Sequence, residues 1–120
     1  MPVTASIDRI TDPQSGSCSV VTLAGRMTLG SSLSLLESQV QAELAAGVNK
    51  MVFDLTAVDF LDSAGLGMLI YTYGALKKTG GSIRLCGVDP RILNLLKLTN
   101  SDSFLAIDAT REDSLAAINA

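Results

Sequence analysis

Residues 59–67 have the sequence DFLDSAGLG, and the organisation of the chain can be worked out from them. They follow the apolar run MVFDL at residues 51–55 and open the longest amphipathic segment of the protein. This succession predicts a strand, a short turn and a helix. Asp62 is a good N-cap, because its carboxylate can accept hydrogen bonds from backbone N–H groups that lack helical partners. Ser63 then occupies the first position of the helix.

The Ser63 hydroxyl is a candidate site for a phosphate. It is expected beside the positive end of the helix dipole, where negative charge is stabilised. Gly65 and Gly67 in the first turn keep side-chain bulk away from it. Serine is also common at helix starts for structural reasons, and the local sequence by itself favours that structural role.

The remaining chain alternates between strand-like and helix-like patterns. Period-two alternation near the N-terminus and turn residues at 12–16 predict a hairpin of the first two strands. Helical patterns separate the later strands, as parallel strands joined by crossover helices require. We predict a single α/β domain over residues 1–120, with a mixed, mostly parallel sheet, an N-terminal antiparallel hairpin and four α-helices. The predicted strands are 3–8, 18–24, 51–55, 83–88 and 104–107, and the predicted helices are 31–46, 63–79, 90–98 and a terminal helix from residue 110.

Several helix ends carry recognisable signals. Ser34 and Glu37 have the spacing of a capping box, although the helix can begin a turn earlier. Gly47 and the pair at 80–81 are expected to end the first and second helices. The buried stripe of the second helix is predicted from apolar residues at helical spacing: Leu66, Leu69, Ile70, Tyr73 and Leu76.

Composition excludes several classes of function. The 120 residues are 48% hydrophobic, which fits one domain with a real core, and the net charge of −3 argues against a nucleic-acid partner. The chain has no His, which removes Ser-His-Asp and Cys-His catalysis and a phosphohistidine relay. We therefore predict that the protein is not an enzyme. No signal peptide pattern and no apolar run near the ~20 residues of a membrane span are found, so a cytoplasmic protein without membrane insertion is predicted.

Acidic residues and cysteines offer two further candidate sites. Asp54, Asp59 and Asp62 could together suggest a magnesium site, since Mg²⁺ prefers carboxylate oxygens. The alternative, which we prefer, is that Asp54 ends a strand, Asp59 lies in the loop and Asp62 caps the helix, and we predict no metal and no cofactor. Cys18 and Cys86 lie in separate apolar runs and are expected to be small buried residues.

Residues 52–69, VFDLTAVDFLDSAGLGML, resemble the STAS domain family, the fold shared by anti-sigma factor antagonists and sulfate transporter tails. In the antagonist branch an apolar strand is followed by D-S-[SA]-G-L-G. Further stretches match in register, so the resemblance covers nearly the whole chain. They are LAGRM at 23–27, GGSIRL at 80–85 and RILNLLKLT at 91–99.

The resemblance implies a partner switch. Family antagonists bind an anti-sigma factor that is a serine kinase of the histidine-kinase-like ATPase fold, and this binding frees the sigma factor. The kinase phosphorylates the Ser after the helix-capping Asp, which ends binding, and a PP2C-type phosphatase reverses the modification. By position that serine is Ser63. The implied partner-binding residues are Asp59, Asp62, Ser63, Ala64, Gly65, Leu66, Met68 and Thr28, with Leu66 and Met68 expected on the exposed side of the helix start.

Two positions depart from the family pattern. Thr28 stands where many antagonists have an acidic residue in the loop near the phosphosite, and Ser101 stands where the family often has Leu. Two other roles stay open. One is a STAS subunit that docks on the ATPase of a membrane transporter, and the other is a module that binds a nucleotide or another small ligand.

Overall fold

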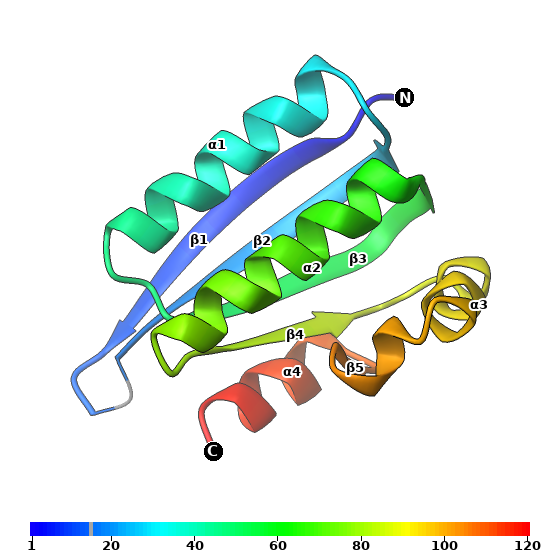
Figure 1. Ribbon diagram of the computed structural model, residues 1–120. Helices are drawn as coiled ribbons and strands as arrows, with labels where there is room; N and C mark the ends of the chain where they lie inside the picture. The colour runs from blue at the N-terminus through cyan, green and yellow to red at the C-terminus, as the bar shows by residue number, and fades with distance from the viewer. Residues whose placement is uncertain (15) are drawn as a thin grey trace.

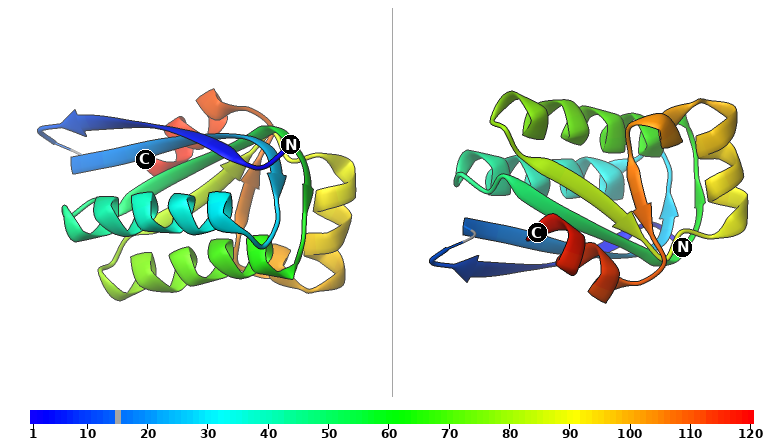
Figure 2. Two further views of the ribbon diagram at one scale, coloured as in Figure 1. Left: turned by 90° about the horizontal axis from the view of Figure 1, so that it is seen from above. Right: turned by 90° about the horizontal axis from the view of Figure 1, so that it is seen from below.

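Five strands form one mixed sheet in the order β1-β2-β3-β4-β5, shown from three sides in Figures 1 and 2. The computed structural model describes residues 1–14 and 16–120, and of Asp12 it describes the backbone only. The strands are β1 (Thr4–Asp12), β2 (Gly16–Met27), β3 (Lys50–Leu61), β4 (Ser82–Cys86) and β5 (Ala106–Asp108). The helices are α1 (Ser31–Ala45), α2 (Ser63–Lys78), α3 (Pro90–Leu98) and α4 (Arg111–Ile118), with a 3-10 turn η1 (Ser101–Ser103).

The predicted fold class is confirmed. β1 pairs antiparallel with β2, and the three later pairs are parallel. The hairpin is longer than predicted, because its register runs from Thr4 opposite Ala24 to Asp12 opposite Gly16. Of the predicted turn at 12–16, Ser15 lies outside the described residues.

The sheet separates two layers of unequal size. Helices α1 and α2 cover one face, and α4 lies on the opposite face (Figure 2). The main core lies under α1 and α2 and includes the fully buried Phe53, Leu23 and Leu85. A smaller apolar cluster under α4 contains Cys18 and Cys86, both buried as predicted. Burial raises the pKa of the Cys86 thiol to about 11, so this thiol is protonated at neutral pH.

Strand β3 is much longer than the predicted 51–55. Its pairing with β4 ends where Asp54 lies opposite Cys86, but its pairing with β2 continues, through two register shifts, to Leu61 opposite Met27. The length of β2 explains the difference, since β2 supplies a backbone partner beyond residue 55. Asp59 therefore lies in a strand and not in a loop, and Asp54 lies within the strand and not at its end.

The helix ends agree closely with the sequence signals. Gly47 has φ 91° and Gly80 has φ 75°, and both follow the last turn of a helix. At the end of α2, the N–H of Gly80 donates to Lys77 O and that of Gly81 to Leu76 O, which satisfies carbonyls without helical partners. The capping box at Ser34 does not form, because α1 begins a turn earlier, at Ser31.

Two details of the packing correct the predictions. Ile70 is exposed, while Met68 and Thr72 are buried, because α2 packs against α1 as well as against the sheet. The last strand is Ala106–Asp108 and not 104–107, since η1 precedes it and the Phe104 ring packs on Tyr73, with ring centroids 4.9 Å apart. Strand β4 also ends at Cys86, two residues before its predicted end.

Candidate functional site

The site lies where β3 ends and α2 begins. Asp62 is the N-cap of α2, as predicted, and its Oδ1 accepts hydrogen bonds from the N–H groups of Ala64 at 2.9 Å and Gly65 at 3.0 Å. Ser63 is the first helical residue and is exposed to solvent. The hydroxyl is therefore accessible at the positive end of a 16-residue helix.

Asp62 also joins two loops. Its second carboxylate oxygen, Oδ2, accepts a hydrogen bond from the N–H of Leu29 at 2.9 Å, and its own N–H donates to Met27 O at 3.2 Å. The Leu29 bond first, and then the helix N–H groups, hold the pKa of Asp62 below its usual range. Asp62 is thus a carboxylate at neutral pH and fixes the β2–α1 loop beside Ser63.

Gly65 has a different role from the one expected. A Cβ atom on Gly65 would lie 2.3 Å from Met27 O, so the close approach of α2 to β2 requires glycine here. Gly65 is buried against this backbone, whereas Gly67 is exposed with open space around it. The first glycine therefore serves packing between two elements and not the accessibility of the hydroxyl.

Three of the predicted partner-binding residues are buried. Gly65 is buried, and Met68 is 5% exposed within the main core, because its side of α2 faces α1. Leu66 is 8% exposed and was also expected on the exposed side, but it lines a groove beside Ser63. Asp59 is exposed, and Ala64 and Thr28 are partly so.

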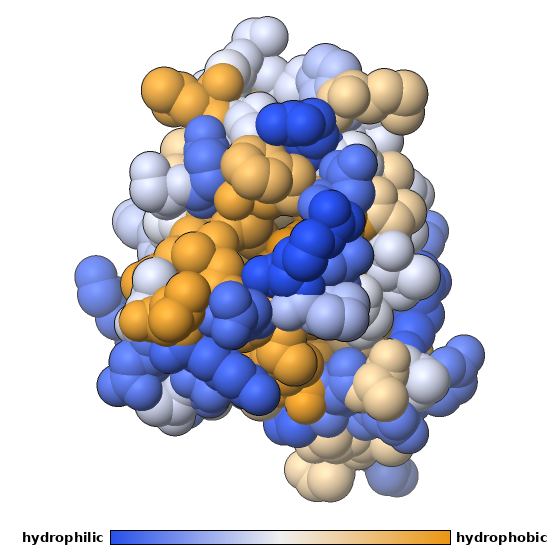
Figure 3. Space-filling model, turned by 90° about the vertical axis from the view of Figure 1, so that its right-hand side faces the viewer, coloured by the Kyte–Doolittle hydropathy of each residue, from blue (hydrophilic) through white to orange (hydrophobic). Residues whose placement is uncertain are grey.

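An apolar groove of about 690 Å³ runs from Ser63 to α3. Figure 3 shows hydrophobic surface bordered by hydrophilic residues on the side of the molecule that carries α3. Phe60, 43% exposed, and Leu98, 76% exposed, contribute apolar surface, and Arg91 adds a cationic group. The full lining is Asp59, Phe60, Leu61, Asp62, Ser63, Leu66, Arg91, Ile92, Asn94, Leu95, Leu98 and Thr99.

The contribution of α3 was missed from the sequence, although a signal was present. Five of its nine residues are Ile or Leu, more than one buried stripe of so short a helix can accommodate. Only Ile92 and Leu96 are buried, and of the remaining three, Leu95 and Leu98 line the groove. Phe60 was not predicted as a site residue, although it lies in the stretch DFLDSAGLG; its ring lies 4.6 Å from the guanidinium carbon of Arg26.

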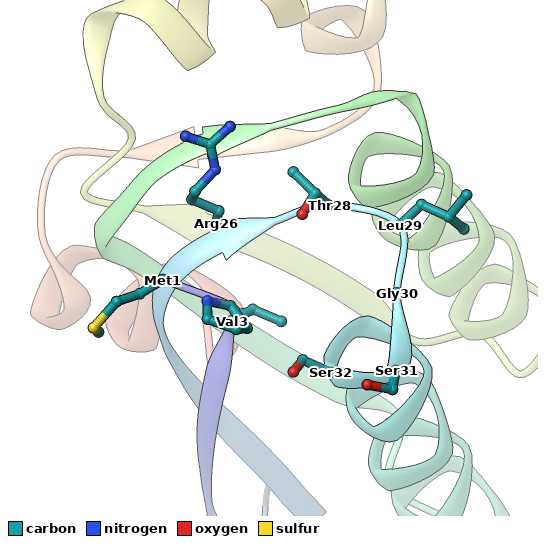
Figure 4. A pocket seen from close by; sticks show the side chains of 9 residues that line it. Met1, Val3, Arg26, Thr28, Leu29, Gly30, Ser31 and Ser32 are labelled. Carbon is teal, nitrogen blue, oxygen red and sulfur yellow. The ribbon is translucent and has the colours of Figure 1, made fainter.

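A second pocket lies on the other side of the β2–α1 loop. Its volume is about 310 Å³, and Figure 4 shows the residues that line it, from the N-terminal segment, the end of β2 and the start of α1. Leu29 stands at the bend of the loop and is 82% exposed. No sequence signal marked Leu29, because its position depends on the hydrogen bond to Asp62.

The three aspartates considered for a metal do not come together. Asp54 accepts hydrogen bonds from Arg111 and from Thr56, on the face covered by α4, while Asp62 accepts three backbone N–H groups. Within residues 1–14 and 16–120, no group of three His, Cys, Asp or Glu side chains is placed to hold a metal ion. In the same residues, no helix has the length and apolar character needed to cross a membrane.

Comparison with known proteins identifies the family. The profile of the STAS domain matches residues 9–114, so the chain belongs to the STAS domain family, as the sequence motif predicted. The anti-sigma-B factor antagonist of Bacillus subtilis (strain 168) is 32% identical over 93 residues, which cover 77% of this chain and 83% of that protein.

Solved structures of other proteins share this fold. The crystal structure of an anti-sigma factor antagonist from Mycobacterium paratuberculosis is 28% identical, with a TM-score of 0.80 over 98% of this chain and 95% of the other. The Bacillus cell fate determinant SpoIIAA in its phosphorylated form has a TM-score of 0.71 over 94% of this chain and 99% of the other. At 15% identity, this likeness shows a shared fold alone.

Proposed function

We propose that this protein is an anti-sigma factor antagonist. In its unphosphorylated form it binds an anti-sigma factor serine kinase of the histidine-kinase-like ATPase fold, and the bound kinase releases its sigma factor. The kinase then phosphorylates Ser63 and the complex dissociates, until a PP2C-type phosphatase restores the hydroxyl. The role requires no catalysis by the chain itself and no cofactor, and it belongs in the cytoplasm, where sigma factors act.

The observation that carries this proposal is the setting of Ser63. Its hydroxyl is exposed at the first position of α2, directly after an N-cap whose carboxylate holds three backbone N–H groups. A protein kinase can reach such an exposed hydroxyl, and the names of the relatives support the choice of partner.

The proposed contact surface is centred on Ser63. It comprises Asp59, Asp62, Ala64 and Thr28, together with Leu66 where it lines the groove. Gly65 and Met68 act from inside the fold by keeping α2 in place against β2 and α1. The apolar groove extends this surface toward α3.

Electrostatics explains how phosphorylation ends binding. A phosphate adds about −1.5 to −2 charges at neutral pH. In the free protein the N-terminus of α2 offsets this charge by about 0.3–1 kcal/mol. In the complex the dianion loses water beside the carboxylates of Asp62 and Asp59, at a cost of several kcal/mol. Since about 1.4 kcal/mol is a factor of ten in affinity, a micromolar or nanomolar complex dissociates without refolding of the antagonist.

The test is incubation of the protein with its cognate kinase and ATP, followed by mass spectrometry of the peptide that contains Ser63. We expect one phosphate at Ser63 and none in Ser63→Ala. Ser31, which is exposed at the start of α1, serves as an internal control for a second helix-start serine. A phosphate at Ser31 or elsewhere, or none with an active kinase, would contradict the proposal.

The groove supports one alternative function, a module that binds a small apolar ligand. Its volume of about 690 Å³ lies within the usual range for ligand sites, and its walls are mostly apolar. Titration calorimetry with nucleotides and apolar ligands distinguishes the two functions. Micromolar binding of a ligand, together with no binding of the kinase, would favour the alternative.

A further inference from the structure

Leu29 is a large apolar side chain in an unusual position. It is 82% exposed and lies between Thr28 and Gly30, at the bend that joins β2 to α1. Exposed leucines that stand alone are common and need no function. We assign a function to Leu29 because of the contacts that hold its backbone.

Four contacts fix the loop relative to Ser63. The N–H of Leu29 donates to Asp62 Oδ2 at 2.9 Å, and the N–H of Asp62 donates to Met27 O at 3.2 Å. Met27 is also the last residue of β2 to pair with β3, and Gly65 of α2 lies directly against its carbonyl. The Asp62 carboxylate, which caps the helix of Ser63, therefore also sets the position of Leu29. A protein that binds at Ser63 thus also meets Leu29.

The loop that carries Leu29 has no charged side chain of its own, although the Asp62 carboxylate accepts the Leu29 N–H. Residues 28–32 are Thr, Leu, Gly, Ser and Ser, without a charged side chain. Figure 4 shows the Leu29 side chain turned away from Met1 and Arg26, and Arg26 itself lies over the Phe60 ring. Asp62 lies between two apolar features, since it accepts the Leu29 N–H on one side and lines the groove with Leu66 and Leu98 on the other.

We propose that Leu29 is an apolar anchor that enters a neutral, apolar recess of the partner kinase and thereby determines which kinase this antagonist accepts. The inference rests on the proposed function and adds a specificity residue to it. A rigid backbone favours this role, because little conformational entropy is lost when the side chain is buried. Central apolar anchors that become fully desolvated dominate the affinity of protein interfaces. The Leu29 side chain offers no hydrogen-bond partner, so a kinase that buried a polar group against it would desolvate that group without compensation, and an apolar recess is favoured.

The test compares the affinity of the cognate kinase for wild type, Leu29→Ser, Leu29→Met and Leu35→Ser. Leu35 is the matched control, because it is also an exposed leucine, 61% exposed, but lies on α1. We expect Leu29→Ser to bind about 10- to 30-fold more weakly, Leu29→Met to bind nearly as wild type, and Leu35→Ser to stay within about twofold. Thermal melts of all four proteins check that the fold is retained.

The outcomes separate this inference from the proposed function. Wild type that fails to bind the kinase would overturn the proposed function and the anchor with it. Wild type that binds, with Leu29→Ser equal to wild type or to Leu35→Ser, would overturn the anchor alone. A loss of affinity in Leu29→Met as large as in Leu29→Ser would also overturn it, because an apolar recess accepts methionine.

Discussion

Two aspartates at β3 are held in opposite ways. Asp54, inside the strand and 9% exposed, is paired with Arg111 of α4, whose Nη2 lies 2.9 Å from Asp54 Oδ2 and also donates to Thr22. Asp62, directly after the strand, has no basic partner among the described residues and accepts only backbone N–H groups. The first arrangement fastens a helix to the sheet, and the second leaves a surface open for a partner.

The same contrast extends to the neighbours of each group. Next to the Asp54 pair, Arg84 forms a second ion pair with Asp108, and Ser114 also donates to Asp108, so α4 lies over a network of side chains. Around Asp62 the contacts are made by backbone groups of Met27, of Leu29 and of the first turn of α2, which includes Gly65. Side chains therefore hold the covered face, and backbone geometry holds the exposed site.

The largest effect is expected at Gly65, where a methyl group breaks the contact that supports Asp62. In Gly65→Ala the new Cβ would lie 2.3 Å from Met27 O, so α2 must shift, and we expect a loss of about 2–3 kcal/mol of stability. Gly67→Ala is the matched control on the same helix, with no atom within 4 Å of its Cβ. It should gain about 0.5–1 kcal/mol, because alanine favours helix. Urea denaturation of both variants measures the effects, and similar changes in the two would contradict this account of the site.

A smaller effect is expected from removal of Arg111 on the covered face. Arg111→Met leaves the Asp54 carboxylate with only its Thr56 donors in a largely buried position. Because the Arg111 side chain is 37% exposed and water can reach the pair, we expect a loss of about 1–2 kcal/mol. Arg91→Ala, which breaks the exposed pair with Asp89, should leave the denaturation midpoint nearly unchanged. If Arg91→Ala cost as much as Arg111→Met, the distinction between covered and exposed pairs would fail.

The smallest effect is expected at low pH, where the contributions of Asp54 and Asp62 to stability are lost. Burial opposes the charge of Asp54, but donors from Thr56 and Arg111 outweigh it, so the pKa of Asp54 lies below normal, as does that of Asp62. A lowered folded-state pKa means that the stabilisation is present above the unfolded value of about 3.9 and is lost as the pH falls through the folded value. We therefore expect the urea concentration at the unfolding midpoint to decrease when the pH is lowered below about 4.

The variant Asp62→Asn tests how much the Asp62 carboxylate contributes to the loss of stability at low pH. Asparagine also caps helices well through its oxygen, but its NH₂ group cannot accept the Leu29 N–H that Asp62 Oδ2 accepts. We therefore expect stability near pH 7 to fall by about the contribution of one hydrogen bond, while the loss in acid becomes shallower. Denaturation midpoints from pH 2.5 to pH 7 measure this. An acid profile equal to that of wild type would show that the hydrogen bonds to Asp62 do not stabilise its charged form.

The part of the site that is local in sequence could be predicted. The cap at Asp62, the first helical position of Ser63 and the glycine ends of α1 and α2 each depend on a few consecutive residues, and all were found. The hairpin and the parallel order followed from the succession of patterns. The length of β3 was not found, because it depends on pairing with β2.

Contacts between distant residues could not be predicted. Asp54 and Arg111 are 57 positions apart, and Asp62 and Leu29 are 33 apart, with no pattern that links them. The requirement for glycine at position 65 comes from the carbonyl of Met27 in another strand. The burial of Met68 follows from the packing of α2 on α1, which the hydrophobic pattern of α2 alone does not determine.

The central claim is that a charge on Ser63 switches a binding surface without refolding it. The most direct measurement is the affinity of the cognate kinase for the unphosphorylated protein, for the protein fully phosphorylated at Ser63, and for Ser63→Ala. We predict that Ser63→Ala binds as the unphosphorylated protein does and that phosphorylation weakens binding at least about 100-fold, the factor that nearly 3 kcal/mol represents. Equal affinities for the phosphorylated and unphosphorylated forms would contradict the account.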